Sequence, residues 1–521
     1  MTSGKSIRDN TVLLPNWLTR CAENAPAHLA VQCGATRWSF AELAEQVDRL
    51  ARQLAVAGVG EESRVALLAA NGPAYVAFVH ALTLLGAILV PLNIRLTVDE
   101  ICWQLSDVHA ALLVSDARMA DRANEIRVAL PELPQAVLQT AAHAPDQCEV
   151  TLLTRRGETY PEAGIVPHSL IDLDATQAIM YTSGTTGRPK GAIITYGMQW
   201  WNAIGSALNL GHRPDDCWLA CLPLFHIGGL SILMRSVIYG ISVILLEKFD
   251  EYTVNQAIQQ DGVTIISVVA VMLQRMLTAL TEKDRQARYP ATLRCVLLGG
   301  GPAPRPLLEQ CASLHIPAAQ TYGLTESCSQ AVTLAPADAL RKLGSAGRPL
   351  LPVRLRIMHE NQPVPDGEPG VIYLQGPTIT PGYADRPEAT AEAFQDGWFC
   401  TGDLGYLDED GYLYVLDRRS DLIISGGENV YPAEVESVLL SYPAVAEVGV
   451  CGQADLRWGQ VPVAFVKLHP GQHTDAAVIL EHARQHLAGY KVPRAIHFVD
   501  ELPRNSSGKL LRRELPRLLP L

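Results

Sequence analysis

The sequence predicts an α/β fold with a large N-terminal domain of layered α/β subdomains, a small β subdomain and an α+β C-terminal domain. Its 521 residues exceed what one compact core accommodates. Short β-rich runs alternate with helix-length segments through roughly the first four hundred residues, as in sheets covered by helices. Beyond Val353 strands are broken by Gly, Pro and Asp turns, and beyond Asp417 helices and strands alternate again.

The first region supplies the layered sheets. Its strand-length apolar runs are Arg64–Ala69, Ala111–Val114, Ala178–Tyr181, Val243–Leu246, Thr264–Val269 and Cys295–Leu298. Helix-length segments between them are Pro73–Leu85, Met272–Ala279 and Pro304–Ser313. The stretch from Ala74 to Val90 approaches membrane-spanning length, but it contains polar residues and ends at Pro91. We expect a buried helix that runs into a strand, with no membrane insertion.

The two later regions are predicted as separate units. Gly370–Gln375 is predicted as a strand and Gly405–Val415 as a hairpin, which indicates a small all-β subdomain. The last region is predicted to contain the helices Pro432–Leu440 and Asp475–Leu487 and the strands Val445–Val450, Pro462–Lys467 and Ile496–Phe498. We therefore expect an N-terminal domain over residues 1–416 and a C-terminal domain of usual size over residues 417–521.

Charge limits the classes of partner. The formal net charge is -12, so phosphodiester backbones and anionic lipid surfaces should be repelled overall. A basic cluster near the C-terminus is interpreted as a solvated helix face; its members are Lys509, Arg512, Arg513 and Arg517. The partners that remain are small molecules, and nucleic acid is excluded.

Cysteine usage and the N-terminus indicate a cytoplasmic protein. The eleven cysteines occur singly, without a CxxC pair, which is typical of reduced thiols. Cys217, Cys221 and His226 do not have the spacing of a zinc site. The N-terminus lacks an apolar run long enough for a signal peptide. The sequence does not select an oligomeric state and leaves a homodimer open.

One loop suits a triphosphate. Residues 182–191 follow the apolar strand Ala178–Tyr181 and combine three glycines, four serine or threonine hydroxyls and the mobile positive charge of Lys190. Glycines let backbone N–H groups approach a ligand, and hydroxyls and a lysine add donors and charge. The Walker spacing is absent, and a plain flexible loop is the alternative. The candidate phosphate-binding residues are Thr182, Ser183, Gly184, Thr185, Thr186 and Lys190.

This loop resembles the phosphate-binding signature of the adenylate-forming superfamily, which includes acyl- and aryl-CoA synthetases. Five further signatures of that family follow in order and extend the resemblance over nearly the whole chain. They are residues 222–226 (LPLFH), 320–326 (QTYGLTE), 401–403 (TGD), 417–421 (DRRSD) and 503–509 (PRNSSGK). The resemblance implies an acid:CoA ligase that uses ATP and Mg²⁺ to form an acyl-adenylate and then transfers the acyl group to coenzyme A.

The chemistry of these motifs fits such a reaction. Glu326, beside Thr325, is a hard carboxylate ligand suited to Mg²⁺, and Tyr322 offers a ring for adenine. Asp403, expected in a Gly-flanked turn, can accept ribose hydroxyls, and Arg418 can reach ribose or phosphate. Taken singly, Glu326 would more often be a solvated surface acid, Asp403 an ordinary turn acid and Arg418 a salt-bridge partner.

The resemblance adds further candidates. For the nucleotide it implies the glycine-rich wall Gly300, Gly301 and Pro302 and the motif residues Thr321 and Gly323. His226 would line the acyl pocket, although a histidine beside Phe225 is often a packed core residue. Lys509 would act in catalysis from a C-terminal domain that rotates about a hinge near residues 417–421. Ser420 departs there from the Asp or Lys that many relatives carry.

Several longer runs resemble the bacterial 2-succinylbenzoate:CoA ligases of menaquinone biosynthesis, above all residues 415–432. Such a substrate carries a second carboxylate that needs a cation or several donors. Arg235 is the cation near His226, and Ser231 could assist it; the alternative is that Arg235 extends to the surface. Three other classes stay open: a general aryl- or fatty-acyl-CoA ligase, a carrier-loading adenylation domain and a non-catalytic nucleotide-binding protein.

Overall fold

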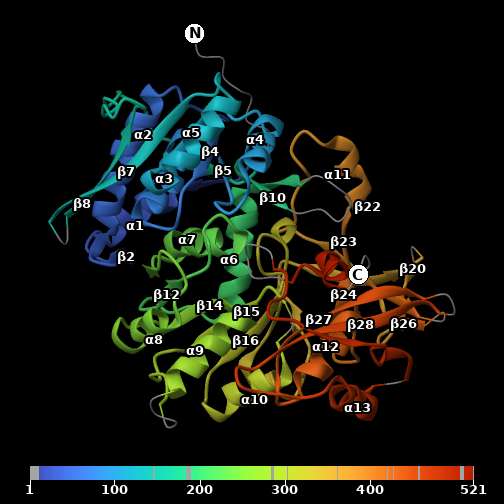
Figure 1. Cartoon of the computed structure of the whole chain (residues 1–521). Coiled ribbons are helices and arrows are strands. Elements are labelled where there is room, and N and C mark those ends of the chain that lie inside the picture. The colour runs from blue at the N-terminus through green and yellow to red at the C-terminus, as the bar shows by residue number, and fades with distance from the viewer. Residues whose placement is uncertain are drawn as a thin grey trace.

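Figure 1 shows the computed structural model of the chain, coloured from the N-terminus to the C-terminus. The structure describes residues 11–144, 147–182, 189–282, 287–301, 303–360, 362–418, 421–425, 428–455, 458–487, 489–504 and 510–519. Within these residues two large sheets form the main body, and two smaller sheets follow along the chain. The predicted α/β class with its additional β and α+β units is confirmed.

The first large sheet has the strand order β11-β10-β5-β4-β6-β7-β8. Its central strands are parallel, and β11 and β8 pair antiparallel at its two edges. Its strands are β4 (Arg64–Leu68), β5 (Ile88–Pro91), β6 (Leu112–Asp116), β7 (Gln135–Ala144), β8 (Gln147–Leu153), β10 (Thr176–Thr182) and β11 (Lys190–Thr195). A separate pair joins β1 (Leu13–Pro15) to β9 (Leu170–Asp172).

The second large sheet has the order β18-β17-β16-β15-β14-β12-β13-β2-β3. From β16 to β2 its strands are parallel, with antiparallel strands at both edges. Its strands are β2 (Leu29–Cys33), β3 (Thr36–Ser39), β12 (Cys217–Ala220), β13 (Ser242–Leu245), β14 (Ile265–Val269), β15 (Cys295–Gly299), β16 (Ala318–Tyr322), β17 (Val332–Leu334) and β18 (Arg348–Pro349).

Helices lie between the two sheets and on their outer faces. On β4, Val65 and Leu67 belong to the core between the sheets, whereas Ala66 and Leu68 belong to the core of the outer face. Burial on both faces explains why the parallel strands are continuously apolar. The helices between the sheets are α1 (Trp17–Asn24), α2 (Phe40–Val56), α3 (Pro73–Leu85), α6 (Tyr196–Leu210) and α7 (Ile227–Tyr239). The outer helices are α4 (Val98–Asp107) and α5 (Ala120–Ala129) on the first sheet, and α8 (Glu251–Gln260), α9 (Ala270–Glu282) and α10 (Arg305–Ser313) on the second.

The long apolar stretch after residue 73 is a buried helix followed by a strand, as predicted. All residues of α3 are buried, which explains its lack of a polar face. Gly86 ends the helix in the left-handed region at φ +63°, and the chain enters β5. Among the described residues, no helix has both the length and the apolar character needed to span a bilayer. All eleven cysteines are free thiols, most of them buried.

The small β subdomain contains a helix that the sequence pattern did not predict. Its sheet has the order β20-β19-β21-β23-β22, with β24 paired to β23. The predicted β subdomain is confirmed, but the prediction that it is all-β was wrong, because α11 (Pro387–Ala393) precedes the β22 strand. Its strands are β19 (Arg354–His359), β20 (Gln362–Pro363), β21 (Gly370–Gln375), β22 (Phe394–Gln395), β23 (Trp398–Leu407) and β24 (Leu413–Arg418).

The C-terminal region folds around its own core. Its sheet has the order β26-β25-β28-β27, with β29 beside β28. Helices α12 (Pro432–Leu440) and α13 (Ala476–His486) contribute to the core on one face. The 3-10 helix η5 (Arg512–Leu518) contributes Leu515 to a second cluster. The strands are β25 (Ile423–Ser425), β26 (Glu428–Val430), β27 (Val445–Asp455), β28 (Gly459–Leu468) and β29 (Ile496–Phe498).

The prediction that the basic C-terminal cluster is a solvated helix face was wrong for Arg512. Its side chain is 15% exposed and forms ion pairs with Glu436 at 2.6 Å and Asp421 at 3.4 Å. Arg513 and Arg517 are exposed, as expected. Arg512 therefore attaches the tail to α12 and to the last residue of the predicted hinge.

Candidate active site

The strands that flank the predicted phosphate loop bring its two ends together. Thr182 ends β10, Lys190 begins β11, and the two residues are paired in the hairpin register. The loop between them leaves from the carboxyl end of β10, the edge at which α/β sheets bind ligands. The predicted phosphate contacts of Ser183, Gly184, Thr185 and Thr186 fall outside the described residues.

Glu326 lies beside Thr182, the last residue of β10, and belongs to the 3-10 turn η2 (Thr325–Ser327). Its side chain is buried, and its Oε1 accepts hydrogen bonds from Thr182 Oγ1 at 3.2 Å and from the Tyr383 hydroxyl at 3.1 Å. Among the described residues, no donor contacts Oε2. A carboxylate fixed through one oxygen, with the other unshared, is the type of hard ligand that Mg²⁺ prefers. The site therefore fits the predicted metal.

Tyr383 was not predicted from the sequence. Residues 382–384 pair with β11, and the Lys190 ammonium lies 5.3 Å from the centroid of the Tyr383 ring. Burial and the neighbouring Glu326 raise the pKa of Tyr383, so its hydroxyl remains a donor to the carboxylate. Tyr383 thus contacts both the lysine of the loop and the predicted metal ligand.

Tyr322 and Asp403 form one unit. The Tyr322 hydroxyl donates to Asp403 Oδ2 at 2.7 Å, and the Asp403 side chain is buried. The prediction that Asp403 lies in a turn was wrong, because it lies within β23, directly opposite Arg418 of β24. The strand nevertheless contains Gly402 at φ +73°, which is the origin of the turn-like pattern. Nothing is described of the Arg418 side chain.

The predicted adenine wall follows β15. Gly300 has φ +78°, which favours glycine, and Gly301 is open, with no atom within 4 Å of an added Cβ. At Gly323 an added Cβ would lie 1.5 Å from the Ser329 carbonyl oxygen, so the turn beside Tyr322 requires glycine. Thr321 Oγ1 contacts Val332 O and Thr333 Oγ1, both at 3.0 Å, and its hydroxyl is engaged inside the sheet.

His226 precedes α7 and is a neutral, partly buried imidazole. Its ring centroid lies 4.7 Å from that of Phe225, and its buried Nε2 has no hydrogen-bond partner among the described residues. Burial, followed by the charge of Arg95, lowers the pKa of His226 to about 4. An unpaired buried nitrogen is uncommon in a packed core, which favours a ligand-facing role for this histidine.

We expect His226 not to titrate in the working range of the enzyme. With its pKa near 4, the imidazole is neutral between about pH 5.5 and pH 8. The ratio of kcat/KM between the wild type and His226→Gln should therefore be constant over that range. Measurement of adenylation at several pH values checks this, and a ratio that changes with a midpoint near pH 6.5 would mean that His226 titrates in the free enzyme near the ordinary pKa of histidine.

Arg235 lies on α7 and is buried, with 1% of its surface exposed. It therefore does not extend to the surface, which was the alternative to a role in substrate recognition. Its guanidinium lies over the Trp218 ring at 5.3 Å and donates to Asn202 Oδ1. Among the described residues no carboxylate pairs with Arg235, and its Nε has no partner. Burial lowers the pKa of Arg235, and no carboxylate of the described residues offsets this effect.

Further groups around Arg235 leave the charge uncompensated. Burial raises the pKa of the Cys328 thiol to about 12, so this neighbour stays neutral. Ser231 is fully buried next to the Cys328 thiol, and among the described residues its Oγ has no nitrogen or oxygen partner. Asn202 also donates to the Gln330 carbonyl at 2.8 Å, which connects Arg235 to the segment after Glu326. A buried cation and a buried hydroxyl on one helix fit the predicted carboxylate site.

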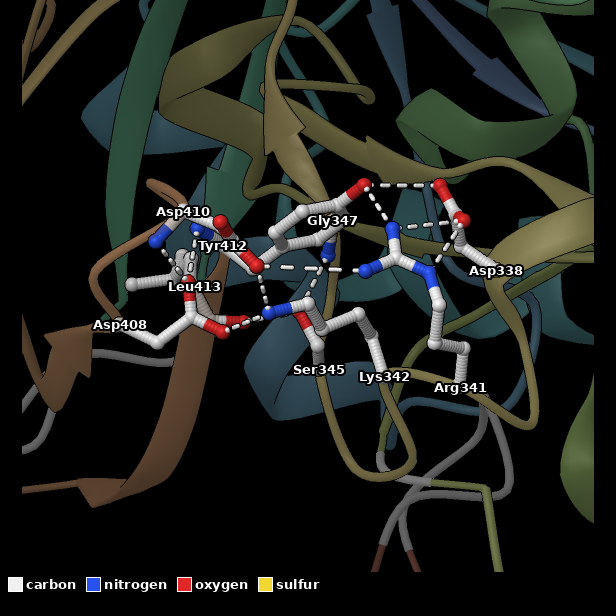
Figure 2. Close-up of polar contacts among 9 residues, drawn as sticks. All are labelled: Asp338, Arg341, Lys342, Ser345, Gly347, Asp408, Asp410, Tyr412 and Leu413. Atoms are coloured by element: carbon white, nitrogen blue, oxygen red, sulfur yellow. Dashed lines mark hydrogen bonds and ion pairs between the residues drawn. The ribbon is translucent and has the colours of Figure 1, made fainter.

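A polar cluster at the far end of the β23–β24 hairpin fixes this hairpin to the loop after β17. Lys342 Nζ donates to Asp408 Oδ2 and Asp410 Oδ2, both at 2.6 Å, as Figure 2 shows. Arg341 Nη2 donates to the Tyr412 hydroxyl at 2.9 Å, and the ammonium of Lys342 lies 4.7 Å from the ring centroid of Tyr412. The cations lie on the loop after β17 and the carboxylates on the turn of the hairpin, so ion pairs attach the turn to this loop.

The hairpin continues from this cluster to the candidate site. Leu413 N donates to Gly347 O at 2.8 Å, which adds a backbone connection at the same end. At the other end of the two strands lie Asp403 and Arg418, where the chain enters the C-terminal region. The cluster therefore anchors the strand pair that carries the predicted ribose contact.

Besides the four loop residues named above, three further predicted positions lie outside the described residues. They are Pro302 of the adenine wall, Ser420 at the predicted hinge and Lys509 in the C-terminal tail. The described part of the site thus contains Thr182, Lys190, Tyr322, Glu326 and Asp403 of the predicted nucleotide side, and the segment of His226, Ser231 and Arg235.

These residues and the layered fold define a class of enzymes that bind adenosine phosphates next to a carboxylate substrate. The chain belongs to the AMP-binding enzyme family. The family model described as AMP-binding enzyme matches residues 18–384, and the AMP-binding enzyme C-terminal domain matches residues 434–509. The predicted superfamily is confirmed.

Named relatives cover almost the full length. A 2-succinylbenzoate–CoA ligase of Geobacillus kaustophilus is 53% identical over 97% of this chain and 98% of its own. Among solved structures, o-succinylbenzoate CoA synthetase (MenE) from Bacillus subtilis with the acyl-adenylate OSB-AMP has a TM-score of 0.86 at 43% identity, covering 97% of this chain and 98% of that one. The same enzyme with ATP and a magnesium ion also has a TM-score of 0.86 at 43% identity, covering 97% and 100%.

Proposed function

We propose that this chain is an AMP-forming acid:CoA ligase that converts 2-succinylbenzoate to 2-succinylbenzoyl-CoA in menaquinone biosynthesis. The observation that carries the proposal is the similarity to two relatives named 2-succinylbenzoate–CoA ligase, which are 53% and 50% identical over 97% of this chain and 98% of their own. The buried, uncompensated Arg235 supports a substrate with a second carboxylate. ATP and Mg²⁺ are the cofactors, and CoA is the second substrate.

In the first half-reaction a carboxylate oxygen of the acid attacks the α-phosphorus of ATP, and pyrophosphate leaves. Lys190 and the loop after Thr182 bind the phosphates, while Tyr322 and Asp403 hold the adenosine. Glu326 ligates Mg²⁺, which neutralises charge on the phosphate oxygens. Thr325, beside Glu326, adds a hydroxyl. Binding the three reactants in line supplies most of the acceleration, because few covalent steps need a protein group.

In the second half-reaction the CoA thiolate attacks the acyl carbonyl carbon, and AMP leaves with the bonding electron pair. We propose that residues 417–521 rotate relative to residues 1–416 between the two steps. Lys509 would neutralise the α-phosphate region during the first step and withdraw before the second. Arg418, at the end of β24, would contact ribose or phosphate.

His226, Ser231 and Arg235 would bind the acid. All three lie on or directly before α7, so one helix positions the residues proposed to bind the acid. The guanidinium would pair with the carboxylate that does not react, and the Ser231 hydroxyl would donate to it. A homodimer and a cytoplasmic location stay predictions; sedimentation of the purified protein tests the first, and fractionation of the source cells tests the second.

The experiment that tests the proposed function is pyrophosphate exchange into ATP. Exchange should require 2-succinylbenzoate and Mg²⁺ and should not require CoA, because adenylation precedes thiolysis. Addition of CoA should then yield the thioester. The proposal is contradicted if 2-succinylbenzoate supports no exchange while another acid does.

Arg235→Ala is expected to raise the KM for 2-succinylbenzoate far more than the KM for an analogue that lacks the second carboxylate. Loss of a charge-assisted contact should cost roughly 1.5–3 kcal/mol, or about ten- to a hundredfold in kcat/KM. Steady-state kinetics with both acids measures the difference.

Arg294→Ala is the matched control for the structural cost. Arg294 is another little-exposed arginine, but it pairs with Asp216 at 2.6 Å. The Arg294→Ala variant should lower the stability of the fold and change the KM for both acids by the same factor. Equal effects of Arg235→Ala on the two acids would remove Arg235 from substrate recognition.

A further inference from the structure

Asn71 joins the first sheet to the segment that precedes His226. It lies between β4 and α3, at the carboxyl edge of the first sheet, and is 5% exposed. Its Nδ2 donates to Leu222 O at 3.0 Å and to Leu246 O at 3.2 Å, and its Oδ1 accepts from Leu224 N at 2.9 Å. The amide nitrogen and the amide oxygen of Asn71 are thus both hydrogen-bonded to backbone groups next to the second large sheet.

The backbone groups that Asn71 binds lie beyond the ends of strands. Leu222 and Leu224 follow β12, and Leu246 follows β13, so these groups have left the ladder hydrogen bonds of their sheet. Buried backbone groups need hydrogen-bond partners, and here the side chain of Asn71 is the partner of three such groups. The path of residues 222–226 depends on this contact.

That path determines where His226 begins α7. His226 N donates to Pro223 O at 3.1 Å, and Leu230 N donates to His226 O at 3.0 Å. At Gly229 an added Cβ would lie 2.3 Å from Pro223 O, so the segment packs directly on the first turn of α7. A displaced segment would displace the start of the helix that carries the proposed acid-binding residues.

Asn71 is itself held by its own sheet. Arg118 Nη2 donates to Asn71 O at 3.4 Å and Arg118 Nη1 to Glu247 at 3.0 Å, while Asp116 accepts from Ala70 N at 3.1 Å. The asparagine is therefore attached to a rigid element and is not a mobile surface residue.

We propose that Asn71 is a positioning residue that sets the affinity for the acid through the segment of residues 222–226. The proposal rests on the proposed function, because it assigns His226 and α7 to the acid. Asn71 contacts no reacting atom. A change at Asn71 should therefore alter the KM for the acid and not the KM for ATP, whose proposed contacts include residues of β10, β11, β16, β23 and β24.

Asn71→Asp is the test variant. It keeps the shape and the acceptor for Leu224 N but places an oxygen against two carbonyl oxygens in place of the amide donors. In pyrophosphate exchange the KM for 2-succinylbenzoate should rise about tenfold or more, with the KM for ATP changed less than about twofold.

Asn255→Asp is the matched control. Asn255 on α8 is also buried, donates to Met276 O at 2.9 Å and accepts from the Tyr289 hydroxyl at 2.6 Å. Both variants should lower the melting temperature, and only Asn71→Asp should shift the acid KM. If Asn71→Asp does not fold, Asn71→Ser takes its place in the same comparison.

The outcomes separate the two proposals. Equal shifts in the KM for acid and for ATP, or kinetics of the Asn71 variant that match the control, would overturn the role of Asn71. A wild type that shows no exchange with 2-succinylbenzoate would instead overturn the proposed function.

Discussion

Lys509→Ala is expected to slow acyl-adenylate formation from acid and ATP by about a thousandfold or more, with thioester formation from supplied acyl-adenylate and CoA nearly unchanged. The lysine is remote in sequence from every other ATP motif, so it can reach the site only when the C-terminal region closes over it. A flexible stem with a point charge can stabilise the first transition state and then leave. Single-turnover measurements of the two half-reactions give the two rates.

Arg513→Ala is the control for this experiment. Arg513 is a nearby, exposed cation of the same tail and should leave both half-reactions unchanged. If Lys509→Ala slows both half-reactions alike, or neither of them, the proposed alternation of the C-terminal domain is wrong.

Glu326→Gln is expected to abolish adenylation while the fold stays intact. Glutamine keeps a carbonyl oxygen that can accept from Thr182 and Tyr383, but it removes the charge that Mg²⁺ needs. The loss should be about a thousandfold or more. Pyrophosphate exchange over a range of Mg²⁺ concentrations measures it, and thermal unfolding verifies the fold.

Tyr383→Phe serves as the graded companion of this variant. It removes one hydrogen bond to Glu326 and leaves the carboxylate charged, so its effect should be much smaller and partly restored by excess Mg²⁺. Near-normal exchange by Glu326→Gln at ordinary Mg²⁺ would exclude Glu326 as the metal ligand.

Local sequence patterns predicted the elements well where burial and periodicity agree. The predicted bounds of α3 and β21 match the structure, because an all-apolar helix closed by Gly86 and a strand between turn residues carry strong local signals. Other elements are longer than predicted. β27 extends to Asp455, for example, because its polar end pairs with β28, and such pairing leaves no apolar signal.

The candidate site was predictable where its residues belong to contiguous motifs. Glu326, Thr182 and Tyr322 were found in this way, and the structure brings Thr182 and Glu326 into contact. Tyr383 and Asn71 were missed, because each acts through contacts with residues far away in the sequence. A single tyrosine after a glycine, or a single asparagine after a strand, has no pattern that distinguishes it from a structural residue.

The identity of the acid is the central claim, and CoA-ester formation by the purified enzyme tests it most directly. The panel contains 2-succinylbenzoate, coumarate, benzoate and octanoate, each with ATP, Mg²⁺ and CoA, and the esters are quantified by mass spectrometry. We expect kcat/KM for 2-succinylbenzoate to exceed that for each other acid by about a hundredfold or more, because a buried cation left unpaired penalises acids without a second carboxylate. Equal or faster conversion of benzoate, coumarate or octanoate would contradict the account and identify a general acyl- or aryl-CoA ligase.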